Sequence, residues 1–301
     1  MDTRQLRAFL TVIDTGGISS AAEKLGYAQS TVSDQLRTLE RDLGVSVLNR
    51  TSVGTIPTEA GARLLPYARR LLDLDGEMRR DVTGARPLLR IGTLDSIAGE
   101  WLPDILAAFN HGAGGADIEA EIVLSVASRA RLHEDLAAGR LDAVIVFDNG
   151  VRAPGESATL YRDQVVLVAA PEHPLADVRP VTLDMLRKAD FLVADRGCTS
   201  RMLFDQFGRD FAPEVRVAMV TGSKAALIRL VSRGIGVALM PMIGVRSDLE
   251  SGDLIALDVP EGLATIGIEA SWRSGLGTAE KPLRALLEIA RRHGDLSALV
   301  N

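Results

Sequence analysis

The chain has 301 residues, more than one ordinary compact core accommodates, so its length predicts at least two domains. Its 47% of hydrophobic and 25% of charged residues are typical of a soluble globular protein, and no apolar run reaches membrane-spanning length. A single cysteine, Cys198, excludes an internal disulfide and a cysteine-based metal cluster. The charged start of the chain is no secretory signal, so we expect a cytoplasmic protein without a membrane partner.

The charge of the chain does not by itself indicate nucleic-acid binding. The net charge is −6, and residues 1–58 carry six Lys or Arg against six Asp or Glu. Because this segment is neutral, any contact that it makes with DNA must come from individually placed groups.

The first sixty residues predict three helices followed by two short strands. The first helix has the apolar stripe Leu6, Phe9, Leu10 and Ile13 and ends at Gly16. The second is capped by Ser19 and stops at Gly26, and the third buries Val32, Leu36, Leu39 and Leu43 before Gly44. The strands are expected over 45–48 and 51–55.

The third helix has a polar outer face, which is concentrated at its start. That face carries Gln29, Ser30, Thr31, Ser33, Asp34 and Arg37. Two helices joined by a tight turn, the second polar on its outside, form a helix-turn-helix, whose second helix enters the major groove of DNA. The alternative is a protein-interaction module with a solvated third helix, and spacing alone does not decide between the two.

Longer segments of the sequence resemble one family. The segments LRAFLTVIDTGGISSAAEKLG (6–26), QSTVSDQLRTLE (29–40), LGVSVLNR (43–50) and PTEAG (57–61) are similar to the LysR-type transcriptional regulators. The resemblance implies a winged helix-turn-helix DNA-binding domain over 1–58, a dimerising linker helix over 59–87 and an effector-binding domain over 88–301. It assigns the polar face of the third helix to double-stranded DNA and places Arg50 in the wing. Asp34 is acidic where the family often has a basic or neutral residue, and we expect it to pair with Arg37.

The linker segment shows a heptad pattern. Leu64, Ala68, Leu71, Asp75, Met78 and Val82 are spaced by fours and threes. A long helix with one apolar seam favours a dimer. The resemblance to the family implies that two such dimers can associate into a tetramer. The alternative is a surface helix that lies on its own domain, and Asp75 on the seam either weakens the dimer or fixes its register.

The remaining two hundred residues alternate short strands with helices, which predicts an α/β fold with a mostly parallel sheet. The segments LAAGRLDAVIV (136–146) and LVSRGIGVALM (230–240) resemble the LysR effector domain, which is similar to periplasmic solute-binding proteins. This implies lobe I at about 88–162 and 268–301 and lobe II at about 163–267. Crossover strands are expected near 159–164 and 265–271, with a small molecule between the lobes.

Candidate effector residues follow strands or open helices, where ligands of such sheets bind. They are Thr93, Asp95, Ser96, Ser128, Arg129, Phe147, Cys198, Thr199, Arg201 and Ser223. Arg129, Arg196, Arg201 and Lys224 could pair with a carboxylate or phosphate, and as a cluster they favour a small anionic effector. Ser96, Ser128, Thr199 and Ser223 are also good helix caps, which is the alternative role of each.

Nothing in the sequence indicates catalysis or a bound cofactor. The four histidines are scattered without metal-ligand spacing, and no dinucleotide, phosphate-loop or nucleophile motif is present. We therefore expect a DNA-binding regulator and no enzyme. The alternative function is a cytoplasmic small-molecule-binding protein with a degenerate helix-turn-helix.

Overall fold

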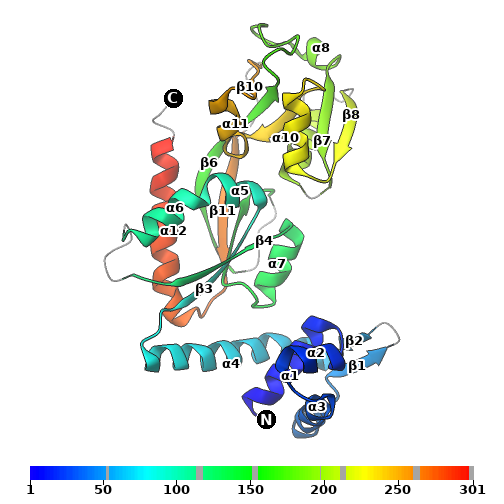
Figure 1. Ribbon diagram of the computed structural model, residues 1–301, viewed down its shortest axis with the longest axis vertical. Coiled ribbons are helices and arrows are strands. Elements are labelled where there is room, and N and C mark those ends of the chain that lie inside the picture. Colours follow the sequence, from blue (N-terminus) through cyan, green and yellow to red (C-terminus); the bar gives the residue numbers. More distant parts are fainter. Residues whose placement is uncertain are drawn as a thin grey trace. The chain divides into compact units, whose positions relative to one another are not determined.

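The computed structural model describes residues 1–51, 54–112, 118–150, 155–196, 198–210, 215–259 and 265–297 (Figure 1). The chain divides into two compact units. The N-terminal unit comprises residues 1–88 with 137–140, and the C-terminal unit comprises residues 89–136 with 141–301.

The N-terminal unit contains three short helices, a hairpin and a long helix. Its elements are α1 (Thr3–Thr15), α2 (Ile18–Leu25), α3 (Gln29–Leu43), β1 (Leu48–Thr51), β2 (Gly54–Pro57) and α4 (Glu59–Thr83). The three short helices end at the predicted glycines, Gly16, Gly26 and Gly44, whose φ angles of 75°, 68° and 70° are left-handed. The predicted helix-turn-helix is therefore present as α2 and α3.

Apolar side chains from these helices form one core. Leu6, Phe9, Val32, Leu36 and Leu39 are all buried in it, as their helical spacing predicts. Two details differ from expectation. Leu43 is 37% exposed, and Ser19 lies inside α2, which begins at Ile18 with Gly17 as its N-cap.

The hairpin lies about three residues later than predicted. β1 and β2 pair antiparallel from Leu48 opposite Pro57 to Thr51 opposite Gly54. The segment before β1 is fixed by Glu40 of α3, whose Oε1 accepts from the Ser46 hydroxyl at 2.7 Å and from the Val47 amide at 2.9 Å. These contacts between distant residues set the start of the strand, and they tie the hairpin to α3.

The start of α4 packs tightly on the same segment. Thr58 caps the helix by accepting from the Gly61 amide at 3.0 Å, and its hydroxyl donates to the Ser46 carbonyl at 2.8 Å. A Cβ on Gly61 would lie 2.0 Å from the Val47 carbonyl oxygen, so the approach requires glycine.

Part of the predicted seam of α4 faces its own unit. Leu64 and Ala68 pack on the core of the three short helices. Asp75 is paired with Arg79 at 3.1 Å and with Arg7 of α1 at 3.8 Å, so it has partners within its own unit. The exposed apolar stripe runs instead through Tyr67, Leu71, Leu74, Met78 and Val82.

The C-terminal unit alternates strands and helices as predicted. Its elements are β3 (Leu88–Thr93), α5 (Asp95–Glu100), α6 (Leu102–Asn110), β4 (Glu121–Val126), α7 (Arg129–Ala137), β5 (Ala143–Phe147), β6 (Glu156–Ala169), α8 (Leu183–Leu186), β7 (Asp190–Ala194), α9 (Thr199–Asp210), β8 (Arg216–Thr221), α10 (Lys224–Ser232), β9 (Ala238–Pro241), η1 (Met242–Gly244), α11 (Arg246–Ser251), β10 (Ile255–Ala256), β11 (Thr265–Trp272), η2 (Gly277–Ala279) and α12 (Glu280–Ser297).

The large sheet is mixed, so the expectation of a mostly parallel sheet is wrong. Its order is β10-β6-β11-β5-β3-β4, with β9 also pairing with β6. β3 and β5 are parallel, whereas β11 is antiparallel to both β5 and β6. The long strand β6 carries the chain from the first half of this unit to the second, and the antiparallel strand β11 carries it back.

These two strands connect two lobes (Figure 1). Residues 156–164 of β6 pair with β11, and residues 165–168 pair with β9. We call the part with β3–β5, α5–α7 and α12 lobe I, and the part with β7–β10 and α8–α11 lobe II. The predicted crossovers lie within β6 and β11.

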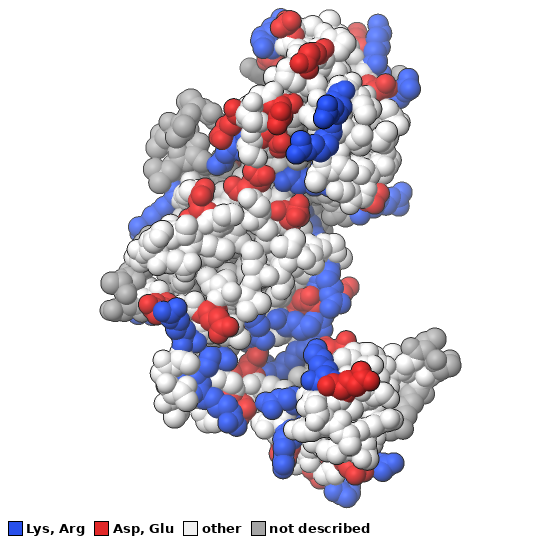
Figure 2. Space-filling model, in the orientation of Figure 1, with Lys and Arg blue, Asp and Glu red and all other residues white. Residues whose placement is uncertain are grey.

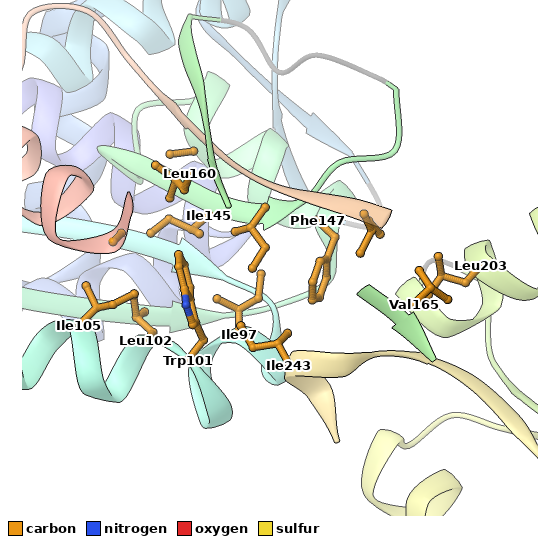
Figure 3. Close-up of a cluster of buried hydrophobic side chains, with 14 of the residues drawn as sticks. Ile97, Trp101, Leu102, Ile105, Ile145, Phe147, Leu160, Val165, Leu203 and Ile243 are labelled. Carbon is orange, nitrogen blue, oxygen red and sulfur yellow. The ribbon is translucent and has the colours of Figure 1, made fainter. Parts of the chain in front are cut away.

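Both faces of the lobe I sheet are covered. Ala143, Ile145 and Phe147 of β5 point into the main core, shown in part in Figure 3, and Val144 and Val146 pack on the side of α7. This alternation follows the two-residue period of a strand. The main core extends into lobe II, where the ring of Phe191 lies 5.4 Å from that of Phe204.

Candidate functional site

The N-terminus of α3 is open to solvent and lacks a side-chain cap. Its N-cap residue is Ala28, which has no polar side chain, and it makes no side-chain capping hydrogen bond. The amides of the first helical turn therefore keep their capacity to bind an anion such as a DNA phosphate.

The structure places the predicted DNA-contacting side chains on one helix. Gln29, Ser30, Thr31, Asp34 and Arg37 are exposed, and Ser33 is half-buried. Arg37 donates to the Asp34 carboxylate at 3.3 Å, which confirms the expected pairing. Arg50 lies on β1 opposite Thr55, but its side chain lies outside the described part of the structure.

Charge is mixed rather than concentrated in this unit. On the face shown in Figure 2, Lys and Arg side chains alternate with Asp and Glu over the N-terminal unit. This agrees with the equal counts of acidic and basic residues in 1–58. Binding to DNA would depend on the position of polar groups more than on bulk charge.

An inner cavity of about 310 Å³ lies between lobe I and lobe II. Five predicted residues line it: Asp95, Ser96, Ser128, Cys198 and Thr199. Thr199 and Ser200 belong to the first turn of α9 and are 7% and 4% exposed. Side chains from both lobes thus converge on one space, as expected for a ligand between the lobes.

An outer cavity of about 770 Å³ adjoins the inner one. The two share Ser128, Arg196 and Cys198 in their linings. The outer cavity also brings together Arg129 from lobe I and Arg201 from lobe II, both predicted residues.

Three predicted effector residues lie outside both linings. The Thr93 hydroxyl is buried and donates to the Ile145 carbonyl at 2.7 Å, and Phe147 is a fully buried core residue (Figure 3). Ser223 caps α10 by accepting from the Ala226 amide at 3.3 Å. These side chains contribute to the fold and lie outside the two cavities.

Most of the remaining inner lining is apolar and was missed. Val126, Ala127, Ala194, Met240 and Pro241 contribute to it. Such residues look in a sequence like any other core residue, so no signal distinguishes them. Lys224, one of the cations expected to pair with an anion, also lines the cavity, and its ammonium lies 3.9 Å from the carboxylate of Glu100 of lobe I.

Glu100 is a further contact between the lobes. Its Oε2 accepts from the Ser247 hydroxyl of lobe II at 3.0 Å, in addition to the pair with Lys224. Burial and the charge of Glu100 raise the pKa of the neighbouring Asp248. Glu100 of lobe I therefore makes polar contacts with two residues of lobe II, in addition to the apolar core that the lobes share.

A buried carboxylate lies where β6 passes between the lobes. Asp163 is 1% exposed, and its Oδ2 accepts from the Ile243 amide at 3.0 Å. Burial raises the pKa of Asp163 to about 6, against the opposing effects of the Ile243 and Gln164 amides and the charge of Arg246.

We expect Asp163 to make the free energy of unfolding decrease as pH rises from about 4 to about 6. Its folded pKa of about 6 exceeds the ordinary 3.8, so its stabilisation is complete below 3.8 and is lost through pH 6, by about 3 kcal/mol at most. Asp163→Asn should remove this dependence. Urea unfolding at about pH 4.5 and 7, followed by the fluorescence of Trp101 and Trp272, measures it; equal pH dependence in both proteins would contradict the assignment.

Among the described residues, no three His, Cys, Asp or Glu side chains are grouped so that they could hold a metal ion. No helix within the same ranges is long and apolar enough to cross a membrane.

Comparisons with known proteins agree with this geometry. Residues 83–295 match the model of the LysR substrate binding domain, and residues 3–62 match that of the bacterial regulatory helix-turn-helix protein, lysR family. The uncharacterized HTH-type transcriptional regulator YeiE of Escherichia coli K12 is 30% identical over 259 residues, which cover 85% of this chain and 86% of that protein.

Two solved structures share the fold. ArgP from Mycobacterium tuberculosis has a TM-score of 0.71 at 18% identity, covering 96% of this chain and 97% of that chain. Full-length LysG from Corynebacterium glutamicum, solved with bound effector Arg, has a TM-score of 0.65 at 24% identity, covering 97% and 99%.

Proposed function

This chain belongs to the LysR family of transcriptional regulators, and from that premise we propose how its two units act. The start of α3 binds the major groove of double-stranded DNA through Gln29, Ser30, Thr31, Ser33 and Arg37, with Asp34 beside them and Arg50 in the wing. A small-molecule effector binds in the inner cavity between the lobes. One observation carries the proposal: the same chain has an exposed polar face at the uncapped start of α3 and a cavity between two lobes.

The domain limits follow the sequence proposal. We infer a DNA-binding domain over 1–58, a linker over 59–87 and an effector domain over 88–301, with lobe I at about 88–162 and 268–301 and lobe II at about 163–267. The change of partners along β6, between residues 164 and 165, supports this division of the lobes.

We propose that the chain acts by binding DNA and an effector, without catalysing a reaction. It does so in the cytoplasm, where it reaches the chromosome. The effector shifts the equilibrium between two arrangements of the lobes, and it does so only by its differential affinity for them. A change in the lobes then alters the spacing of paired DNA-binding domains. We expect neither step to need a cofactor.

Self-association is proposed to use α4. The stripe Tyr67, Leu71, Leu74, Met78 and Val82 is exposed, with Leu74 at 60% and Val82 at 81%. Apolar residues in one stripe of a long helix are rarely left in water, so a second copy of the chain is the expected cover. A dimer also supplies two recognition helices for two half-sites.

Leu74→Glu combined with Met78→Glu is expected to shift the protein toward monomers, because two carboxylates would be buried in the apolar contact. Light scattering across a range of protein concentrations measures the effect. Thr83→Glu is the matched control, since Thr83 is exposed on the opposite side of α4. Unchanged oligomers in the double variant would place the interface elsewhere.

The function is tested by selecting genomic fragments with the purified protein and footprinting them with and without a panel of small carboxylates. We expect a footprint over several helical turns that weakens with salt and contains paired half-sites. Failure to retain DNA at low salt would overturn the proposal and favour a small-molecule-binding protein with a degenerate helix-turn-helix.

A further inference from the structure

The two adjoining cavities differ in charge. Asp95 and Asp195 balance Arg196 and Lys224 in the inner lining, where Lys224 is also paired with Glu100 of lobe I. The rest of the inner lining is mostly apolar. The inner cavity therefore offers little net attraction for an anion.

The outer cavity is basic. Arg129, Arg196 and Arg201 line it with a single acidic residue, Asp205. His133 also lines it, and burial together with the charge of Arg129 lowers its pKa, which favours the neutral imidazole at pH 7. The charges of the lining therefore sum to about two positive, from three arginines and one aspartate.

Arg129 is the most constrained of these groups. It is half-buried at the start of α7, where its guanidinium donates to the Phe147 carbonyl. Burial lowers the pKa of Arg129, although the charges of Asp148 and Glu269 oppose that effect. A partly desolvated arginine of this kind gains from an additional anionic partner.

The two arginines of lobe II are not held by buried contacts, so they can bind a ligand without breaking interactions that stabilise the fold. Arg201 pairs with Asp205 at 2.8 Å in an i,i+4 arrangement that is partly open to solvent. Arg196 is exposed and has no hydrogen bond or ion pair with any residue that the structure describes. Two cations on lobe II thus line the same cavity as Arg129 on lobe I.

We propose that the outer cavity is an anion subsite of the effector site, and that the effector is an amphipathic anion. Its carboxylate or phosphate binds between Arg129 of lobe I and Arg196 and Arg201 of lobe II. Its apolar part extends past Ser128 and Cys198 into the inner cavity. This inference rests on the proposed function of the cleft as the effector site.

The subsite explains how such a ligand would act on the lobes. An anion between arginines of both lobes is bound best when the lobes are close, so it favours the closed arrangement. A neutral ligand confined to the inner cavity would lack the additional contribution of these arginines to closure. Guanidinium groups bind both carboxylate and phosphate. An experiment must therefore distinguish a carboxylate effector from a phosphate effector.

The test uses three probes with the same six-carbon chain: hexanoate, hexyl phosphate and hexanol. Titration calorimetry of the full-length protein at constant ionic strength measures the affinity for each. We expect one or both anions to bind at least ten-fold more tightly than hexanol, and the comparison of the two identifies carboxylate or phosphate. Arg129→Gln and Arg201→Gln should each remove most of this preference while hexanol binds unchanged.

Arg187→Gln is the control, because Arg187 forms a surface pair with Asp184 and lines neither cavity. It should behave as the wild type. Equal binding of anions and alcohol, no binding of any probe, or a preference that survives both test substitutions would overturn the subsite. DNA binding measured on the same samples separates the outcomes, since retained DNA binding leaves the regulator function intact when the subsite fails.

Discussion

Thr31→Glu is expected to weaken DNA binding by about 10- to 100-fold, equivalent to about 1–3 kcal/mol. Thr31 is exposed in the first turn of α3, where the uncapped amides face solvent. A carboxylate there repels DNA phosphates and occupies the amides that would bind them. Because an acidic residue in the first turn stabilises a helix, the fold should not suffer.

The measurement is fluorescence anisotropy with a footprinted DNA fragment at one fixed salt concentration. Ser251→Glu adds the same charge to an exposed position of α11 in the C-terminal unit, and it should bind like the wild type. Equal affinities for Thr31→Glu and wild type would remove α3 from the DNA interface. A loss shared by both variants would indicate an effect of net charge alone.

The N-terminal unit could be predicted closely because its signals are local. Apolar spacing and the glycine stops fixed the ends of α1 and α3, and the pairing of Asp34 with Arg37 is a contact within one helical turn. The hairpin was misplaced because its start depends on Glu40, which bonds residues six and seven positions away through a loop. Propensity alone does not reveal such a contact.

The residues of the candidate effector site could be predicted only in part from the sequence. Position after a strand selected Asp95 and Ser128, which line the inner cavity. It also selected Thr93 and Phe147, the last residues of β3 and β5, whose side chains point into the core. A sequence indicates where a strand ends, but which face its last residue occupies depends on register and pleat. The apolar lining residue Met240 carries no signal of its own.

Asp142→Asn is expected to have the largest effect on stability. The Asp142 side chain is 2% exposed and is clamped by Arg90 Nη2 at 2.9 Å and Arg273 Nη2 at 2.7 Å. Removing one partner of a buried ion pair costs about 3–5 kcal/mol, since the other charges stay buried without compensation. The two arginines are 24% and 18% exposed, so water recovers part of that cost. Unfolding in urea, followed by Trp101 and Trp272, measures the loss.

Asp184→Asn is the control for this substitution, because the Asp184 side chain is 82% exposed in its pair with Arg187 and should contribute less than about 1 kcal/mol. A similar small effect at both positions would show that the Asp142 cluster does not hold the sheet together. Burial and the arginine partners shift the pKa of Asp142 in opposite directions. The stability of the protein at low pH is therefore a second and independent test.

Burial acts to raise the pKa of Asp142, but the hydrogen bonds and charge of Arg90, with the charge of Arg273, outweigh it and lower that pKa below 3.8. A lowered folded pKa means that the stabilisation is present above 3.8 and is lost as pH falls through the folded value. Wild type should therefore lose more stability than Asp142→Asn between about pH 5 and pH 3, and the two should converge in acid. If the wild type instead became relatively more stable in acid, burial would dominate, and the two arginines would not be the groups that keep Asp142 ionised.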